Sequence, residues 1–214
     1  MALNACRRCG TCCRKGGPTL HMSDAALLEH IPVSSLVCLR RGEPAFDPRT
    51  GGNQPLRQEL LKIRGKHGNW ECMYFRSSDS ACLAYEHRPV ECRALSCEDP
   101  SEVLAVMDMP PLSRGDIVPA GTALRDLIEE HERLFPVAEA LDRARDRRVG
   151  ADMPDELDSL IRREIHFRDI FAEKVGVADE ELWPYLGRPL WMVLLPLHGD
   201  FRRYDLKTKT ASNC

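Results

Sequence analysis

The chain has 214 residues, 43% of them hydrophobic, so it is long and apolar enough to bury a core. Its formal net charge of −3 lacks the positive excess that drives nonspecific nucleic-acid binding, and we predict no nucleic-acid partner. No apolar run reaches the roughly 18 residues of a membrane span, and the N-terminus has no apolar signal core, so we predict a cytoplasmic protein without a membrane partner.

The first feature along the chain is the run Cys6-x-x-Cys9-x-x-Cys12-Cys13. Thiolates bind soft and borderline metals, and two-residue spacers let a turning backbone aim successive sulfurs at one point. The first three cysteines match the start of the bacterial ferredoxin spacing, in which the fourth thiolate comes from elsewhere. Adjacent residues cannot easily aim at one metal, so we expect Cys13 to point away from Cys12, toward a second metal or the downstream cysteines.

The segment after this run is predicted to form a short helix and then a loop. Ser23 can cap the helix, whose apolar face carries Leu27, Leu28 and Ile31. Residues 41–55 are dense in Gly and Pro, which is typical of a loop.

Residues 70–85 predict a β-hairpin, with strands at 70–75 and 81–85 around a polar turn. Side chains alternate between the faces of a sheet, so the register decides where Cys72 and Cys82 point. A four-residue loop would pair Phe75 with Cys82, put the two thiols on opposite faces and count against a shared site. We predict instead an odd-length loop or a bulge that pairs Tyr74 with Cys82.

The second half of the chain is helical by pattern. Apolar residues recur at helical spacing from Thr122 to Pro136, a second helix is expected to start near Pro154, and Asp179 is expected to cap a shorter one. The apolar stretch 189–197 is cut by a proline and predicts a buried helical turn or strand.

These elements predict an α+β fold that is mostly α. We expect a small cysteine-cluster domain with a short β-hairpin in residues 1–100. A helical region in residues 101–214 is expected to pack on it as one unit or to extend it. The first region holds 14 Lys and Arg against 11 Asp and Glu, and the second holds 16 against 22. Positive charge beside the cysteines would offset the negative charge of metal-bound thiolates.

Ten cysteines without an export signal are expected to stay reduced and to bind metal or be buried. Eight of them form the predicted metal ligands: Cys6, Cys9, Cys12, Cys13, Cys72, Cys82, Cys92 and Cys97. Cys38 lies in an apolar run and is expected in the core, whereas Cys214 ends a polar tail and is expected to be free.

Histidines and arginines near the cysteines are the other candidates for the metal site. We favour a surface or supporting role over metal binding for His87, and ordinary structural roles for the other histidines considered, which are His21, His67, His131 and His166. Arg88 and Arg93 suit hydrogen bonding to thiolates and exposure on the surface equally well. No nucleophile, phosphate-loop or zinc-protease motif is present, so whether the chain is an enzyme stays open.

The cysteine pattern resembles a known family. The run from Cys6 to Pro18, followed by Cys72, by the segment Cys82-Leu-Ala-Tyr-Glu-His-Arg-Pro-Val-Glu-Cys92-Arg93 and by Cys97, is similar to the CxxCxxCC cysteine-cluster family, also called YkgJ-like. The resemblance covers residues 5–98 and implies that the eight cysteines chelate zinc or iron. The flagellin lysine N-methylase is a larger relative with a similar cluster. This chain is much shorter and has no Gly-rich loop for a methyl donor.

Three functions follow, in order of preference. The first is an iron–sulfur protein with a redox or accessory role. The second is a zinc-stabilised module that binds an unknown protein partner. The third is a metal-dependent protein-modifying enzyme similar to the methylase. Thiolate sets serve zinc and iron–sulfur clusters alike, so the spacing leaves the identity of the metal, and the division of ligands between sites, open.

Overall fold

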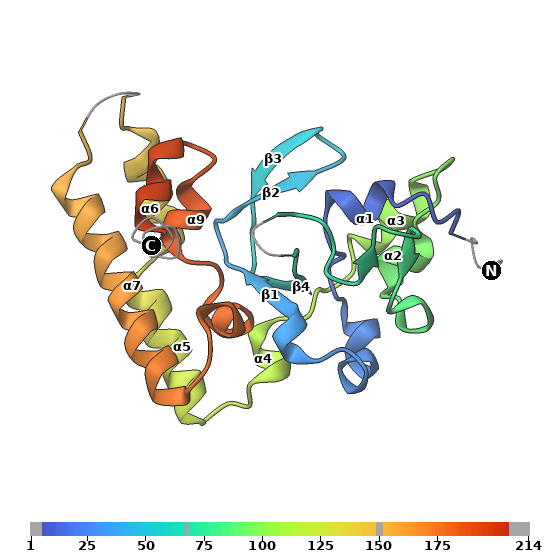
Figure 1. The fold of residues 1–214 in the computed structure, drawn as a ribbon, viewed down its shortest axis with the longest axis horizontal. Helices are drawn as coiled ribbons and strands as arrows, with labels where there is room; N and C mark the ends of the chain where they lie inside the picture. Colours follow the sequence, from blue (N-terminus) through green and yellow to red (C-terminus); the bar gives the residue numbers. More distant parts are fainter. Residues whose placement is uncertain (1–5, 67–68, 149–151, 206–214) are drawn as a thin grey trace.

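The computed structural model describes residues 6–66, 69–148 and 152–205. Helices dominate, and three small antiparallel pairs of strands complete an α+β, mostly α fold, as predicted. The long helices form one end of the molecule, the strands lie in the middle, and the cysteine-bearing segments form the other end (Figure 1).

The helical end is built from four α-helices and a terminal 3-10 helix: α5 Ala123–Leu134, α6 Val137–Arg145, α7 Asp155–Val175, α9 Leu190–Leu194 and η5 Gly199–Tyr204. The helix predicted between Thr122 and Pro136 is α5, and Thr122 caps it by accepting a hydrogen bond from the Arg125 amide. Pro136 ends it as predicted, but the sequence pattern did not predict α6, which follows at once. The start of α7 after Pro154 is confirmed as well. The apolar stretch 189–197 supplies the buried helix α9, whose Leu190 and Leu194 are fully covered.

The central strands are β1 Leu36–Leu39, which pairs with β4 Leu60–Ile63, and β2 Pro44–Asp47, which pairs with β3 Gly52–Pro55. The β2–β3 hairpin occupies the segment predicted to be a loop, so that prediction is wrong. Its glycines mark the turn, where Gly51 has a φ of 69° and donates to the carbonyl of Asp47. β2 is mostly half-buried and β3 is mostly exposed, and neither carries an alternating apolar pattern that would reveal it.

Short elements surround the cysteines: α1 Thr11–Lys15, η1 Met22–Glu29, η2 Val33–Ser35, β5 Phe75–Arg76, β6 Ala81–Cys82, η3 Tyr85–His87, α2 Val90–Ala94, α3 Ser101–Val106 and α4 Arg114–Ile117. The helix that Ser23 was expected to cap is the 3-10 helix η1. It begins at Met22 with His21 as its N-cap, so Ser23 lies within it and the predicted cap is wrong. β5 and β6 pair with Phe75 opposite Cys82 across a four-residue loop, so the predicted odd loop or bulge is wrong.

The helical end packs on β1 through α8 Trp183–Leu186, which follows η4 Asp179–Leu182. Asp179 is the first residue of η4 and Ala178 is its N-cap, so the predicted cap is one residue off. Trp183 lies against Val37 and Leu39 of β1. Next to this contact, the fully buried Arg40 reaches His131 and the carbonyl of Phe135 in α5 and its C-cap. The strands therefore hold the cysteine-bearing segments against a rigid helical block.

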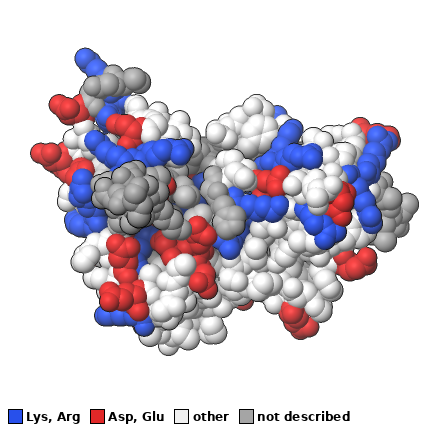
Figure 2. All heavy atoms as spheres, viewed as in Figure 1, with Lys and Arg blue, Asp and Glu red and all other residues white. Residues whose placement is uncertain are grey.

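Within the described part of the chain, no helix is both long and apolar enough to cross a membrane. The face drawn in Figure 2 carries Lys, Arg, Asp and Glu side chains interspersed, without a continuous band of one sign.

Candidate metal centre

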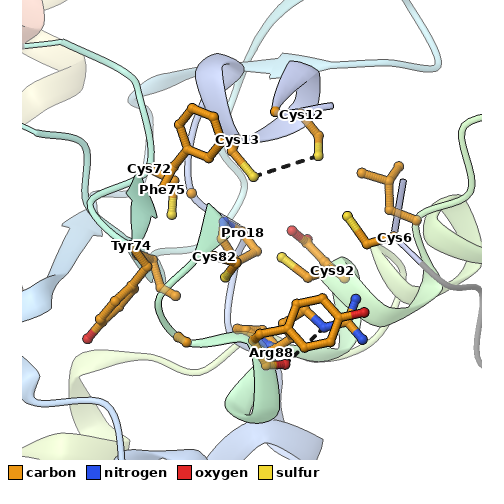
Figure 3. Close-up of a pocket in the computed structure, with 18 of the residues that line it drawn as sticks. Cys6, Cys12, Cys13, Pro18, Cys72, Tyr74, Phe75, Cys82, Arg88 and Cys92 are labelled. Atoms are coloured by element: carbon orange, nitrogen blue, oxygen red, sulfur yellow. Dashed lines mark hydrogen bonds between the residues drawn. The ribbon is translucent and has the colours of Figure 1, made fainter. Parts of the chain in front are cut away.

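All eight predicted cysteine ligands line one cavity of about 340 Å³. The six sulfurs labelled in Figure 3 face a common space from separate segments of the chain. Thiols from positions 6–13, 72, 82 and 92–97 meet here although up to 91 positions separate them in sequence. The fold thus gathers the set that the spacing pattern singles out, and this is the central observation about the site.

Two glycines let the N-terminal run enter the cavity. Gly10 precedes α1 with a φ of 74°, and a Cβ at this position would lie 2.4 Å from the Phe75 ring. A Cβ on Gly17 would lie 2.2 Å from the carbonyl oxygen of Ile63 in β4. The run can therefore approach β4 and the Phe75 ring only because these side chains are missing.

Cys12 and Cys13 do not point apart. Their Sγ atoms lie 3.9 Å apart in α1, so the expectation of diverging side chains is wrong. Cys13 nevertheless also joins the downstream set, because it packs on the core cluster that contains Cys72. In a single helical turn, rotation of the two Cα–Cβ bonds is enough to bring neighbouring sulfurs to van der Waals distance.

Cys72 reaches the cavity by a turn rather than by a strand. Its amide donates to the carbonyl of Cys13 at 2.8 Å, and its own carbonyl accepts from the Phe75 amide at 2.9 Å. The turn ends the alternation of faces before β5 begins, so the register of Phe75 with Cys82 does not separate the two thiols. Cys72 and Cys82 therefore line the same cavity, although the register alone predicts opposite faces.

A buried polar clamp holds the segment that carries Cys92. Asp24 accepts hydrogen bonds from the amides of Val90 and His21, at 2.9 and 3.1 Å. Glu91, which lines the cavity, accepts from the Thr19 amide at 2.8 Å and lies 3.1 Å from Nε2 of His21. This clamp fixes the start of α2 against the chain that follows the N-terminal run.

Sequence reasoning missed the clamp. His21 was given an ordinary structural role, and the carboxylates of Asp24 and Glu91 were not singled out. The two halves are about 70 positions apart, and no local pattern links them. Glu91 does lie within the Arg-Pro-x-x-Cys segment, which is the only signal that could have drawn attention to it.

The protonation of the thiols differs across the site. Burial raises the pKa of the Cys72, Cys82 and Cys92 thiols, and burial together with the neighbouring Cys12 raises the pKa of Cys13 to about 12. A hydrogen bond from the Thr11 side chain lowers the pKa of the exposed Cys9. A metal that binds the inner thiols must therefore displace protons, which couples binding to pH.

Eight thiols are a suitable donor set for a thiolate-bound metal. The distances between their sulfurs distinguish a single ion from a cluster. Among residues 6–66, 69–148 and 152–205, no three His, Cys, Asp or Glu side chains converge closely enough to hold one ion. Tetrahedral zinc with bonds of about 2.3 Å needs sulfurs about 3.8 Å apart, which the Cys12–Cys13 separation of 3.9 Å nearly meets. The thiols as a group surround a volume instead of a point.

Of the other residues considered in the sequence, Arg88 belongs to the cavity wall, whereas Cys38, His87, His131 and Arg93 do not. Cys38 is fully buried in β1, in the core as predicted. His87 stacks on His30 with ring centroids 4.0 Å apart, and His131 is buried beside Glu164. Arg88 lines the cavity, and Arg93 lies 3.7 Å from Asp24. Cys214 and His67 fall outside the described residues.

No protein-family model, curated protein or solved structure matches this chain at a significant level. The resemblance to the CxxCxxCC family therefore rests on the cysteine pattern itself.

Proposed function

We propose that this chain binds a metal centre through the thiolates of its eight clustered cysteines, and that the centre is an iron–sulfur cluster with a redox or accessory role. The observation that carries the proposal is the single cavity lined by all eight thiols. Thiolates at this density repel one another unless a cation compensates them, and a bound metal supplies that compensation.

The size of the cavity favours an iron–sulfur cluster over one zinc ion. A cluster places its thiolate ligands around a body of several irons and sulfides, whereas one zinc draws four sulfurs to a single point. The described thiols surround a volume of about 340 Å³. The spacing of Cys6, Cys9 and Cys12, which matches the start of a ferredoxin motif, supports the same choice.

The test is elemental analysis of the full chain, purified without oxygen, together with a visible spectrum. We expect several irons with matching sulfide and a broad absorption band near ~400 nm, as thiolate-ligated clusters give. A colourless protein free of iron under these conditions would contradict the iron–sulfur assignment.

Single cysteine variants identify the ligands. Cys72→Ser and Cys92→Ser should lower the iron content and the absorption of the purified protein, because serine is a poor replacement for a thiolate ligand. Cys38→Ala is the matched control, since Cys38 is buried in β1 and does not line the cavity. Equal metal content in all three variants would argue against thiolate ligation by the cavity.

Zinc is the second candidate metal, and the distance between the Cys12 and Cys13 sulfurs favours it. The 3.9 Å between these sulfurs is close to the edge of a tetrahedral zinc–thiolate site. On this alternative the chain is a zinc-stabilised module that binds a protein partner. Stoichiometric zinc without colour, and loss of folding on chelation, would support zinc and exclude the cluster.

A further inference from the structure

Four charged residues line the cavity: Arg7, Arg88, Glu91 and Glu98. Within the described chain, only Arg88 among them lacks a group of opposite charge at ion-pair distance. Arg7 forms an ion pair with Glu98, and Glu91 is held by His21 and the Thr19 amide. Within the described residues, no carboxylate lies within ion-pair distance of Arg88. Its positive charge is therefore not neutralised by protein carboxylates.

Arg88 is nevertheless held firmly in place. Its Nε donates to the carbonyl of Tyr85 at 3.0 Å, and its guanidinium lies 4.0 Å from the centroid of the Tyr85 ring. Its Nη1 is buried and has no hydrogen-bond partner in the described structure. A buried donor without an acceptor costs free energy unless a bound group accepts its hydrogen bond.

Arg88 lines the cavity together with the thiols of Cys82 and Cys92 (Figure 3). A guanidinium beside metal-bound thiolates offsets their negative charge. A bound small anion would share the cavity with the carboxylates of Glu91 and Glu98, whose negative charge opposes its binding.

We propose that Arg88 is a positioning residue of the metal centre, whose buried Nη1 donates a hydrogen bond to a ligand or cluster sulfur and whose charge offsets the thiolates. This inference rests on the proposed metal-binding function and assigns a specific role within it. The planar guanidinium stacked on Tyr85 provides a fixed donor, so lysine should replace its charge but not its geometry.

Three variants of the full chain separate these contributions. Arg88→Gln removes the charge, and Arg88→Lys keeps it. Arg8→Gln is the matched control, because the Arg8 guanidinium lies 5.0 Å from the centroid of the same Tyr85 ring but Arg8 does not line the cavity. Circular dichroism checks that each variant is folded before metal affinity is measured by chelator competition.

We expect Arg88→Gln to bind the resident metal roughly 10- to 100-fold more weakly, as loss of a residue supporting metal ligands generally does. Arg88→Lys should recover part of this loss, and Arg8→Gln should stay close to the wild type. If the metal is iron–sulfur, Arg88→Gln should also shift the reduction potential in the negative direction, because loss of a nearby cation disfavours the more negative reduced state. Unchanged affinity and potential would overturn the inference.

The outcomes separate this inference from the proposed function. Metal affinity that is equal in the wild type and Arg88→Gln overturns this inference alone, whereas wild-type protein that holds no metal overturns both. Arg88-dependent binding of inorganic phosphate with metal affinity intact would instead identify an anion site and overturn the inference.

Discussion

The Sγ atoms of Cys12 and Cys13 lie 3.9 Å apart, and Cys13 also packs on the core cluster that contains Cys72. Burial, and then the charge of Cys12, raise the pKa of Cys13 to about 12. Cys12→Ser removes the neighbouring thiolate, so the pKa of Cys13 should fall while staying above its ordinary value of 9.0, because the burial remains. The check is the pH dependence of Cys13 alkylation in metal-free protein.

Cys9 supplies the internal control for that experiment. The Thr11 side chain lowers the pKa of Cys9, so this thiol should react at lower pH than Cys13 in both proteins. A Cys13 titration that is identical with and without Cys12 would show that the two sulfurs are not in contact.

Gly17 should tolerate no side chain. A Cβ there would lie 2.2 Å from the carbonyl oxygen of Ile63, so Gly17→Ala must push the N-terminal run away from β4. We expect a loss of about 1–3 kcal/mol in the free energy of unfolding, measured in urea, and a lower metal content. Gly199→Ala is the control, since nothing lies within 4 Å of its added Cβ. Equal stability of the two variants would contradict the close approach.

His131 should make the protein less stable in acid. Burial lowers the pKa of His131, so the unfolded chain takes up a proton first as the pH falls below about 6.5. As the pH is lowered, His131 should therefore reduce the free energy of unfolding by at most about 1.4 kcal/mol per pH unit. His131→Gln should reduce that slope between pH 7.5 and 5.5 in urea titrations, and an unchanged slope would count against the burial of a neutral imidazole.

His21 should act with the opposite sign. Burial alone would lower its pKa, but Glu91 and the Met109 carbonyl, both acceptors, raise it. Its contribution to stability is complete below about pH 6.5 and is lost as the pH rises through the folded-state pKa. His21→Gln should therefore lose more stability relative to wild type at pH 5.5 than at pH 7.5. The reverse order would indicate that the His21 imidazole is neutral when buried.

Removal of metal should loosen one end of the molecule only. The largest core cluster draws its residues from positions 134–204 and contains no residue of the cavity wall. Hydrogen exchange after chelation should therefore accelerate in α2 and in the N-terminal run, while α7 keeps its protection. Uniform loss of protection along the chain would show that the metal stabilises both ends together.

Local patterns were sufficient for two of the helices. Apolar spacing and two prolines predicted α5 and the start of α7, because these signals lie within the segment that they describe. They did not predict α6. The same logic failed for the β2–β3 hairpin, whose strands are half-buried or exposed and carry no apolar alternation. It failed again for the register of β5 with β6, which are joined by a four-residue loop, and Cys72 lies in the turn before β5.

The sequence by itself determined which cysteines to consider, because their spacing is a property of the chain alone. Only the tertiary structure decided that positions 6–13, 72, 82 and 92–97 share one cavity, and that Arg88 lines it without a carboxylate partner among the described residues. Such contacts depend on how distant segments pack and on the buried clamp between Glu91 and His21. Packing of this kind is a property of the whole fold, and no local stretch of sequence encodes it.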